Sequence, residues 1–285
     1  MLLTELYKWI KRRSFNAGKT LSPREINIII SKTAGIPVER LLTHDNIRIE
    51  PPVFKKISHI VEKRLENYPL QYLLGTIEFM CIDFLISPGV LIPRPETELV
   101  VQTALKLTEQ NNYIDLLDLC CGSGVIGLSI ARMNKHVNVC LSDISPKAVA
   151  LAKKNSKKLR LSRRTRFYTG DLFSALSPSR RFDLIVSNPP YVPHNRISRL
   201  QKEILYEPVY ALDGGKKGME IITRIIGQAH KFLRKNGILV MEHDDTQKKY
   251  LEKICTGSKP AGLEYVETAN DLSGLPRFSI FSVRI

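Results

Sequence analysis

The sequence of 285 residues predicts an α/β fold, in which a parallel, doubly wound sheet follows a small helical bundle and a β-hairpin. Three observations support this prediction. Strand and helix patterns alternate from residue 94 onward, residues 1–75 show helical spacing with few strand signals, and a β-rich segment lies between the two. We therefore expect a helical domain at residues 1–75, a hairpin linker at 76–93 and an α/β domain at 94–285.

The helical domain is indicated by apolar spacing and by one helix-start signal. Leu2, Leu6 and Trp9 recur on one face of the first expected helix. Ser22–Glu25 is typical of a capping box with proline at the first helical position, and another helix is expected to begin at Val53, after Pro51 and Pro52. This segment is basic, with 13 Lys and Arg residues against 7 Asp and Glu residues.

A short β-rich segment and a proline-rich helix start follow the helical domain. Phe79–Ile86 is rich in β-formers and Ser87–Gly89 is a turn signal, so we expect a short hairpin that links the two domains. Pro93–Glu98 then opens a helix, with Pro95 in its first turn. The acidic residues of this segment fit the positive end of the helix dipole.

The remaining sequence alternates apolar strand segments with helical segments, which is the pattern of a parallel sheet covered by helices on both faces. The expected strands are 114–119, 137–142, 184–187, 238–242 and a late edge strand at 278–283. The expected helices are 125–134, 146–159 and 218–232.

The composition is that of an ordinary globular protein, with 43% hydrophobic and 25% charged residues. It excludes wholesale disorder, and no apolar stretch approaches the ~20 residues of a membrane span. The five cysteines form an odd set without zinc-ligand spacing, so we expect a reducing compartment, the cytoplasm, and no metal site. The net charge of +15 fits either a solvated surface or an anionic partner such as nucleic acid.

A glycine-rich turn follows the first strand of the α/β domain, at the place where open sheets of this kind bind ligands. Glycines let the backbone approach a ligand closely. Asp143 ends the next strand, 19 residues after Gly124, where it can accept hydrogen bonds from ribose hydroxyls. The candidate cofactor-binding residues of the turn are Asp118, Cys120, Cys121, Gly122, Ser123 and Gly124.

This turn taken alone leaves the ligand open. Gly122–Gly127 matches the dinucleotide fingerprint G-x-G-x-x-G, which would indicate NAD, and a glycine turn can also serve strand–helix packing only. Asp118 just upstream favours S-adenosylmethionine, because methyltransferases place such an acid near the methionine end of that ligand.

A further strand pattern ends at Asn188 and is followed by Pro189, Pro190 and Tyr191. A purely structural interpretation is a turn that the prolines make rigid, with a tyrosine at the surface. The order resembles, however, the motif of methyltransferases that modify planar NH₂ groups, which are glutamine amides, adenine and guanine. The motif itself does not distinguish among these acceptors.

The chemistry of amide methylation explains these residue types. An amide nitrogen is a poor nucleophile because its lone pair is delocalised. The side-chain carbonyl of Asn188 can accept one N–H of the acceptor, and the main-chain carbonyl of Pro190 can accept the other. The prolines fix φ, and Tyr191 offers a face for stacking on the flat group. Because Asn188 is not a strong base, we expect it to orient the amide, and the proton to leave to water.

Longer motifs resemble the HemK/PrmC family of protein-(glutamine-N5) methyltransferases. Residues 69–75 resemble its P-x-Q-Y-x-x-G, residues 91–98 its L-I-P-R-P-E-T-E and residues 188–191 its N-P-P-Y. Residues 207–215 resemble its E-P-x-x-A-L-x-G-G segment, and residues 271–277 its late D-x-x-G-x-x-R.

The resemblance implies a Rossmann-like class I methyltransferase domain, S-adenosylmethionine as the methyl donor and peptide chain release factors as protein substrates. The acceptor would be the glutamine of their Gly-Gly-Gln loop. The resemblance also places Asp171 and Leu172 near the adenine of the donor, and it assigns Asn188 to both the donor site and the substrate site. Pro189, Pro190 and Tyr191 would complete the substrate site. From the sequence itself we expect no membrane partner, a monomer, and nucleic acid as a possible partner that is not required.

Some residues fit the resemblance less directly. The family commonly has Gly-Thr where this chain has Cys120–Cys121, and its E-x-G-x-x-Q segment lacks the glycine here, at Asp244. Both departures concern loop geometry and not the chemistry. His243 is expected to pack or lie at the surface. Arg94 is a candidate substrate contact that could equally pair with a neighbouring glutamate.

Two other functions compete with the glutamine hypothesis. The basic run from Lys153 to Arg166 would suit an enzyme that methylates amines of nucleic acids, although a solvated helix face explains the run as well. A binding module that retains the fold without activity is the third hypothesis. The intact Asn188–Tyr191 segment argues against it.

Overall fold

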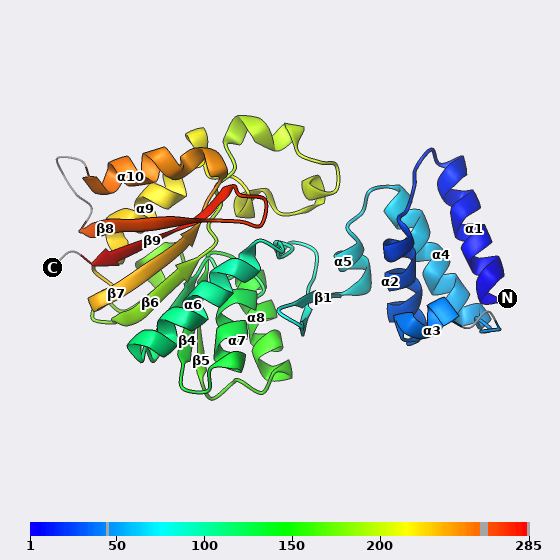
Figure 1. The fold of residues 1–285 in the computed structure, drawn as a ribbon, viewed down its shortest axis with the longest axis horizontal. Helices are drawn as coiled ribbons and strands as arrows, with labels where there is room; N and C mark the ends of the chain where they lie inside the picture. The colour runs from blue at the N-terminus through cyan, green and yellow to red at the C-terminus, as the bar shows by residue number, and fades with distance from the viewer. Residues whose placement is uncertain (44–45, 257–261, 284–285) are drawn as a thin grey trace. The chain divides into compact units, whose positions relative to one another are not determined.

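A computed structural model describes residues 1–43, 46–256 and 262–283. The chain divides into two compact units: unit 1 is Met1–Gly75 together with Lys202–Tyr206, and unit 2 is Thr76–Gln201 together with Glu207–Ile285. Figure 1 shows helices in unit 1 and a sheet flanked by helices in unit 2. The side chain of Cys255 lies outside the described residues, and the other four cysteines are free thiols.

Unit 1 is helical, as the apolar spacing predicts. Its helices are α1 (Leu3–Asn16), α2 (Pro23–Ala34), α3 (Val38–Thr43), α4 (Pro51–Leu65) and α5 (Leu70–Leu74). Trp9 packs edge-on against Phe54, with ring centroids 5.2 Å apart. Buried aliphatic side chains of α1, α2 and α4 form the core: Leu3, Leu6, Ile10, Ile26, Ile29, Ile30, Ile57 and Val61.

The start of α2 forms half of the predicted capping box. Ser22 Oγ accepts a hydrogen bond from Glu25 N at 3.1 Å. The Glu25 carboxylate does not return to the helix start, because it accepts a charge-assisted bond from Arg64 Nε at 2.6 Å. The prediction of a reciprocal box is therefore wrong.

A short segment from later in the chain completes unit 1. Tyr206 packs edge-on against Tyr68, with ring centroids 5.0 Å apart, and its hydroxyl donates to Glu66 O at 3.3 Å. Glu203 pairs with Arg64 at 3.3 Å. Sequence periodicity does not reveal this association, because Tyr206 and Glu66 are 140 positions apart.

The hairpin consists of β1 (Thr76–Phe79) and β2 (Ile82–Leu85), paired antiparallel. Its turn is formed by Met80 and Cys81, with φ values of 52° and 56°. The sequence shows one unbroken β-rich run there, because neither residue is the glycine or asparagine that usually marks such turns. Phe79 and Phe84 are buried in the core of unit 2, so the hairpin packs as part of that unit.

The large sheet of unit 2 has seven strands among the described residues, in the order β5-β4-β3-β6-β7-β9-β8. Strands β5, β4, β3, β6 and β7 are parallel to one another, and β9 runs antiparallel to both β7 and β8. The strands are β3 (Asp115–Leu119), β4 (Asn138–Asp143), β5 (Thr165–Thr169), β6 (Phe182–Ser187), β7 (Leu233–Glu242), β8 (Leu263–Asn270) and β9 (Pro276–Val283).

The helices of unit 2 cover both faces of this sheet, which confirms the doubly wound prediction. Side chains of α6 (Thr97–Asn111), α7 (Val125–Met133) and α8 (Pro146–Lys158) share one buried cluster with the sheet. Side chains of α9 (Glu220–Ala229) and α10 (Lys248–Thr256) share a cluster with the opposite face. In the part of the chain that the structure describes, no helix has the length and apolar character needed to cross a membrane.

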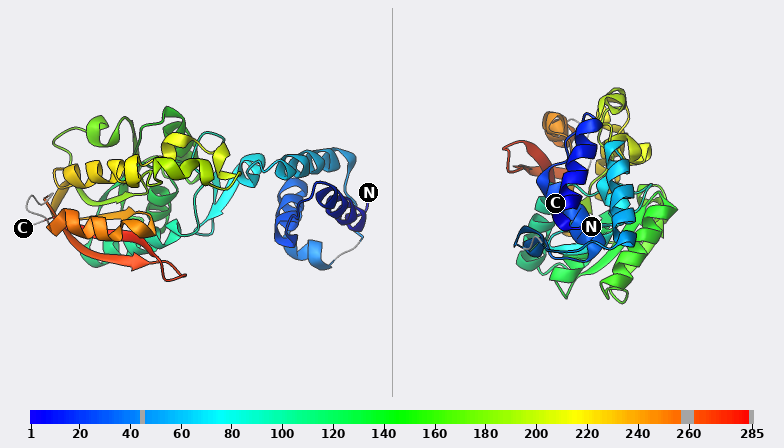
Figure 2. Two further views of the ribbon diagram at one scale, coloured as in Figure 1. Left: turned by 90° about the horizontal axis from the view of Figure 1, so that it is seen from above. Right: turned by 90° about the vertical axis from the view of Figure 1, so that its right-hand side faces the viewer.

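Three features of unit 2 differ from the sequence prediction. Strand β9 is not the edge, because β8 pairs with its outer side (Figure 2). Strands β5 and β8 are not apparent in the sequence, since their exposed positions dilute the apolar pattern. Helix α6 begins at Thr97 and not at Pro95, because Pro95 and Glu96 lie in a tighter turn whose bonds run from Thr97 N to Arg94 O at 3.1 Å and from Glu98 N to Pro95 O at 3.0 Å.

The sheet register brings the predicted site segments together. Leu119 of β3 lies opposite Ser142 of β4 and Ser187 of β6. Cys120, Asp143 and Asn188, which follow these three residues, therefore lie at the same edge of the sheet. Four short 3₁₀ turns lie between β6 and α9 along the chain. Those of unit 2 are η2 (His194–Arg199), η4 (Val209–Ala211) and η5 (Lys216–Gly218), and η3 (Ile204–Tyr206) belongs to unit 1.

Candidate active site

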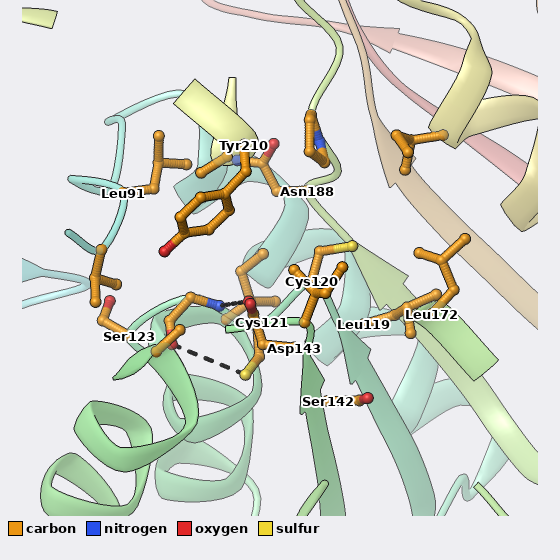
Figure 3. Close-up of a pocket in the computed structure, with 18 of the residues that line it drawn as sticks. Leu91, Leu119, Cys120, Cys121, Ser123, Ser142, Asp143, Leu172, Asn188 and Tyr210 are labelled. Carbon is orange, nitrogen blue, oxygen red and sulfur yellow. Dashed lines mark hydrogen bonds between the residues drawn. The ribbon is translucent and has the colours of Figure 1, made fainter. Parts of the chain in front are cut away.

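A cavity of about 400 Å³ lies in unit 2 at the carboxyl ends of β3, β4 and β6. Its size is within the range of small-molecule sites. Figure 3 shows Tyr210 and Asn188 across the hollow from Cys121 and Asp143. The predicted site residues that line the cavity are Cys120, Cys121, Gly122, Ser123, Asp143, Asp171, Leu172, Asn188 and Pro190.

The glycine-rich turn is fastened to the end of β4 by Asp143. Its Oδ2 accepts the Gly122 N–H at 2.8 Å, and its Oδ1 accepts the Ser145 N–H at 2.9 Å. Burial raises the pKa of Asp143. Each carboxylate oxygen retains a second lone pair, so Asp143 can still accept from a hydroxyl in the cavity.

The two cysteines are accommodated in the turn. Cys120 takes the left-handed conformation, with φ of 61°, where glycine is the usual residue. Burial raises the pKa of both the Cys120 and the Cys121 thiols well above the ordinary value, so both remain neutral. They act here as small wall residues of the cavity.

Asp118 lies beneath the turn, contrary to the expectation that it touches the ligand. Its side chain is buried, Oδ2 accepts the Gly127 N–H at 2.8 Å, and desolvation raises its pKa to about 7. A β-carbon at Gly127 would lie 2.9 Å from Cβ of Asp118. The last glycine of the fingerprint thus allows the carboxyl group to hold the start of α7. Gly124 also lies off the cavity wall, packed against Leu141.

Two hydroxyl groups on the cavity wall have no hydrogen-bond partner among the described residues. Ser123 Oγ and Ser142 Oγ are both buried and both belong to lining residues. Buried polar atoms are normally satisfied, so these hydroxyls favour a polar ligand in the cavity. Together with the glycine turn and Asp143, they fit a nucleoside-bearing donor such as S-adenosylmethionine.

Asn188 lies at the cavity with its amide direction fixed. Its Nδ2 donates to Thr97 Oγ1 at 3.2 Å, and Thr97 Oγ1 donates to Glu242 Oε2 at 2.7 Å. Among the described residues, nothing donates a hydrogen bond to Asn188 Oδ1. An amide carbonyl is therefore available at the cavity as an acceptor.

Tyr191 is placed differently from the sequence expectation. Its hydroxyl donates to Glu242 Oε1 at 3.1 Å, and the residue does not line the cavity. Burial, reinforced by Glu242, raises the pKa of Tyr191. The ring is therefore fastened to the protein interior, which opposes the expected stacking role. Pro189 is also buried and away from the cavity wall.

The backbone after Asn188 is held by close glycine contacts and by one glutamine. A β-carbon at Gly214 would lie 2.8 Å from Pro190 O, and one at Gly218 would lie 2.0 Å from Tyr191 O. Gln247 Nε2 donates to Tyr191 O at 3.0 Å and to Gly218 O at 3.1 Å. The E-P-x-x-A-L-x-G-G segment and the E-x-G-x-x-Q segment therefore serve to support the Asn-Pro-Pro-Tyr turn.

The missing glycine at Asp244 does not disturb this support. Asp244 has an ordinary φ of −69°, and its Oδ1 accepts the Thr246 N–H at 3.1 Å to begin η6 (Asp245–Gln247). Asp244 N also donates to Gln247 Oε1 at 2.9 Å. His243 is buried between Ser279 Oγ and the Asp244 carbonyl, each at 2.8 Å. Desolvation lowers its pKa, as befits a packing residue.

Arg94 pairs with neither of the glutamates considered from the sequence. Its Nη2 lies 2.6 Å from Oε1 of Glu207, which is buried and also accepts the Ile92 N–H at 2.9 Å. Arg94 does not line the cavity. The proline-rich segment before α6 is thus joined to the E-P segment that follows the Asn-Pro-Pro-Tyr turn.

Sequence reasoning missed several residues that line the cavity. Tyr210 lies in the E-P segment, and its hydroxyl donates to Gly89 O at 2.8 Å and lies 3.0 Å from Ser145 Oγ. Thr97 lies in the proline-rich motif at residues 91–98. Its presence in that motif is the one feature of the sequence that could have marked it as a site residue. The others are Val90, Leu91, Pro93, Leu119, Val125, Ile126, Ser142, Ile144, Ala148, Gly170, Ala211, Asp213, Gly215, Glu220 and Ile221.

The fold and the cavity define a class I methyltransferase with S-adenosylmethionine as its donor. A solved methyltransferase from Pyrococcus furiosus has a TM-score of 0.54 and 18% identity, over 73% of this chain and 91% of that chain. The T. thermophilus 16S rRNA N2 G1207 methyltransferase, solved with AdoMet and guanosine, has a TM-score of 0.51 and 17% identity, over 74% of this chain and 50% of that chain. At these identities the likeness concerns the fold.

Sequence comparison identifies the family. The PrmC N-terminal domain matches residues 5–75, and the Methyltransferase small domain matches residues 96–216. Release factor glutamine methyltransferase from Clostridium acetobutylicum is 36% identical over 83% of this chain and 83% of its own length. That from Thermodesulfovibrio yellowstonii is 35% identical over 98% and 96%. The chain belongs to the release factor glutamine methyltransferase family.

Proposed function

We propose that this chain transfers the methyl group of S-adenosylmethionine to the side-chain amide nitrogen of the glutamine in the Gly-Gly-Gln loop of peptide chain release factors. The observation that carries the proposal is the free Oδ1 of Asn188 at the cavity, in a chain of this family. Methylation there would modulate translation termination.

The donor would occupy the cavity beside the glycine-rich turn. The turn residues from Cys120 to Ser123 would hold its methionine part, Asp143 its ribose, and Asp171 and Leu172 its adenine. When bound, S-adenosylmethionine supplies an activated methyl group on a positively charged sulfur. The left-handed φ of Leu172, 50°, shapes the wall where the adenine would lie.

The amide acceptor would be held at Asn188. Its Oδ1 accepts one N–H of the glutamine, and the Pro190 carbonyl accepts the other. The two bonds orient the weakly nucleophilic nitrogen and stabilise the positive charge that grows on it. The surplus proton then passes to water, because an amide oxygen is not a strong base.

Unit 1 would recognise the release factor. We propose a helical substrate-recognition domain at residues 1–75, joined through the hairpin segment 76–93 to a methyltransferase domain at 94–285. We further propose that the protein acts as a monomer in the cytoplasm. Deletion of residues 1–75 should then weaken use of the protein substrate more than it weakens donor binding, while equal loss of both would mean that unit 1 only supports the fold.

Nucleic acid is not required for this activity. The lysines of α8 are exposed while Val149 and Ala152 are buried, which is the pattern of a solvated helix face. Arg164, in the same basic run, donates to the backbone carbonyls of Ala131 and Val137 and serves the fold.

A panel of acceptors tests the proposed substrate. Labelled S-adenosylmethionine is offered with an unmodified release factor, with the variant of that factor whose loop glutamine is alanine, and with unmethylated DNA and RNA. We expect label in the release factor and none in its variant. Label in nucleic acid alone would refute the glutamine proposal while leaving the amine chemistry of Asn188 intact.

A further inference from the structure

Both ends of the Asn-Pro-Pro-Tyr turn are connected to one buried carboxyl group. Glu242 accepts from Thr97 Oγ1 through Oε2 at 2.7 Å, and Thr97 accepts from Asn188 Nδ2 at 3.2 Å. The other oxygen, Oε1, accepts from Tyr191 Oη at 3.1 Å. Thr97 is 2% exposed and Glu242 is 1% exposed, so water does not compete for these bonds.

We propose that Thr97 and Glu242 are positioning residues of the methyl transfer, which hold the Asn188 amide with Oδ1 toward the acceptor nitrogen. This inference rests on the proposed function of Asn188 and deepens it. Neither residue needs to touch the reacting atoms. Their role is to fix which of the two nearly identical ends of the Asn188 amide faces the substrate.

The direction of each hydrogen bond follows from the number of protons available. When Glu242 is ionised, both of its oxygens can only accept, so Thr97 gives its one hydroxyl proton to Glu242 Oε2. Thr97 can then only accept from Asn188, which places Nδ2 on its side. A flipped amide would set Asn188 Oδ1 against the lone pairs of Thr97 Oγ1, and two acceptors would face each other.

The arrangement joins three elements that are distant in the sequence. Thr97 begins α6, Glu242 ends β7, and Asn188 follows β6; the bonded pairs are 91 and 145 positions apart. A buried carboxyl group is costly unless it is hydrogen-bonded, and Glu242 has a donor on each oxygen. The hydrogen bonds that offset its burial come from Thr97, which bonds Asn188, and from Tyr191, so both lead to the Asn-Pro-Pro-Tyr turn.

Substitutions at Thr97 test the proposal with the full-length enzyme and a release factor substrate. Thr97→Val keeps the shape and removes the hydroxyl, so kcat should fall by at least about tenfold, the factor that corresponds to about 1.4 kcal/mol. The dissociation constant of S-adenosylmethionine should change less than about threefold. Thr97→Ser retains the hydroxyl and should restore kcat to near the wild-type value.

Thr108→Val is the matched control for Thr97→Val. Thr108 lies in the same helix, is also 2% exposed, and donates to Leu105 O at 2.7 Å, far from the turn. It should lower stability without lowering kcat of the folded enzyme. Equal loss of kcat in both valine variants, or normal kcat in Thr97→Val, would overturn the positioning role.

Glu242→Gln gives a second test of the hydrogen-bond direction. The amide nitrogen of the new side chain is a donor, so one of Thr97 and Tyr191 loses its acceptor. We expect kcat to fall by at least about tenfold with little change in donor affinity. A wild-type kcat in Glu242→Gln would contradict the proposal.

A readout that needs no substrate separates this inference from the proposed function. The side-chain NH₂ signals of Asn188, assigned by their loss in Asn188→Ala, report its bond to Thr97 by NMR. They should move in Thr97→Val and stay in place in Thr108→Val; unchanged signals in Thr97→Val would refute the inference. Failure of the wild-type enzyme to label any release factor would instead refute the proposed function.

Discussion

The guanidinium of Arg94 lies 2.6 Å from the carboxylate of Glu207, which joins the segment before α6 to the segment that follows the Asn-Pro-Pro-Tyr turn. Glu207 also accepts the Ile92 N–H at 2.9 Å. The pair connects two sequence motifs across 113 positions of the chain. It positions two walls of the same cavity, to which Leu91 and Ala211 belong.

Removal of the cation should be costly because it leaves a buried carboxylate. Arg94→Ala leaves the Glu207 side chain, which is 1% exposed, without the Arg94 cation, and should lower the free energy of unfolding by about 3–5 kcal/mol. Glu207→Ala leaves the Arg94 side chain, which is 30% exposed and within reach of water, so it should cost less. Urea unfolding of both variants measures the difference. A larger loss for Glu207→Ala than for Arg94→Ala would contradict the assigned geometry.

Asp143 should matter chiefly for donor binding. Asp143→Asn places an amide where two backbone N–H groups, those of Gly122 and Ser145, need acceptors. A lost hydrogen bond to a charged group is worth about 1.5–3 kcal/mol, so the dissociation constant of S-adenosylmethionine should rise by roughly tenfold or more. Isothermal titration calorimetry checks this.

Asp183→Asn provides the control for that experiment. Asp183 likewise accepts two backbone N–H groups, those of Ile114 and Asp115, but it lies at the opposite end of the sheet. It should lower stability and leave donor affinity unchanged. Equal losses of donor affinity in the two variants would mean that Asp143 acts only through the fold.

Tyr210 should slow exchange of the donor and its product. Its hydroxyl ties the segment above the cavity to Gly89 and Ser145. Tyr210→Phe removes the tie and keeps the ring, so dissociation of S-adenosylhomocysteine should accelerate by about two- to tenfold. Stopped-flow fluorescence measures the rate. Tyr206→Phe removes a hydroxyl from unit 1 and should leave the rate unchanged.

Glu242 should make stability depend on pH. Burial raises its pKa to about 7 in the folded protein, from an ordinary value of 4.5, so the folded state binds more protons between these values. The contribution to stability is therefore complete below about pH 4.5 and is lost as the pH rises through 7, with a slope up to about 1.4 kcal/mol per pH unit. Tyr191, Arg277 and Glu96 are the titratable neighbours that modulate it.

Unfolding of wild-type protein and Glu242→Gln across this pH range isolates the effect. The difference in the free energy of unfolding between them should vary with pH in the stated direction. The same experiment on Asp118→Asn should show a dependence of the same sign, because burial also raises the pKa of Asp118 to about 7. A pH-independent difference for Glu242→Gln would show that this carboxyl group titrates as it does in water.

Local sequence signals predicted most of unit 2 and the position of its cavity. The apolar runs before Cys120, Asp143 and Asn188 form the strands β3, β4 and β6. The register of these strands places the three residues side by side. The hairpin turn at Met80 and Cys81 and the outer strand β8 escaped prediction, because their residues lack the usual local signal and depend on packing with distant segments.

Roles that depend on long-range partners were the least predictable. Thr97 is a specified residue of a motif, whereas Tyr210 falls on an unspecified position of one. Their hydrogen bonds to Glu242 and to Gly89 span 145 and 121 positions, which local patterns do not reveal. The neighbours of Tyr191 and Asp118 in the sequence predict that Tyr191 stacks on the substrate and that Asp118 lies near the methionine end of the donor. In the structure both side chains point toward the protein interior. The Tyr191 hydroxyl donates to Glu242, and Asp118 accepts from the Gly127 N–H.

The most direct test of the central claim is to locate the transferred methyl group. A release factor incubated with S-adenosylmethionine and this enzyme is digested, and the loop peptide is fragmented in a mass spectrometer. We predict one methyl group on the side-chain nitrogen of the Gly-Gly-Gln glutamine with the wild-type enzyme, and none with a folded, donor-binding Asn188→Ala variant. A methyl group at any other position, or near-normal transfer by Asn188→Ala, would contradict the account.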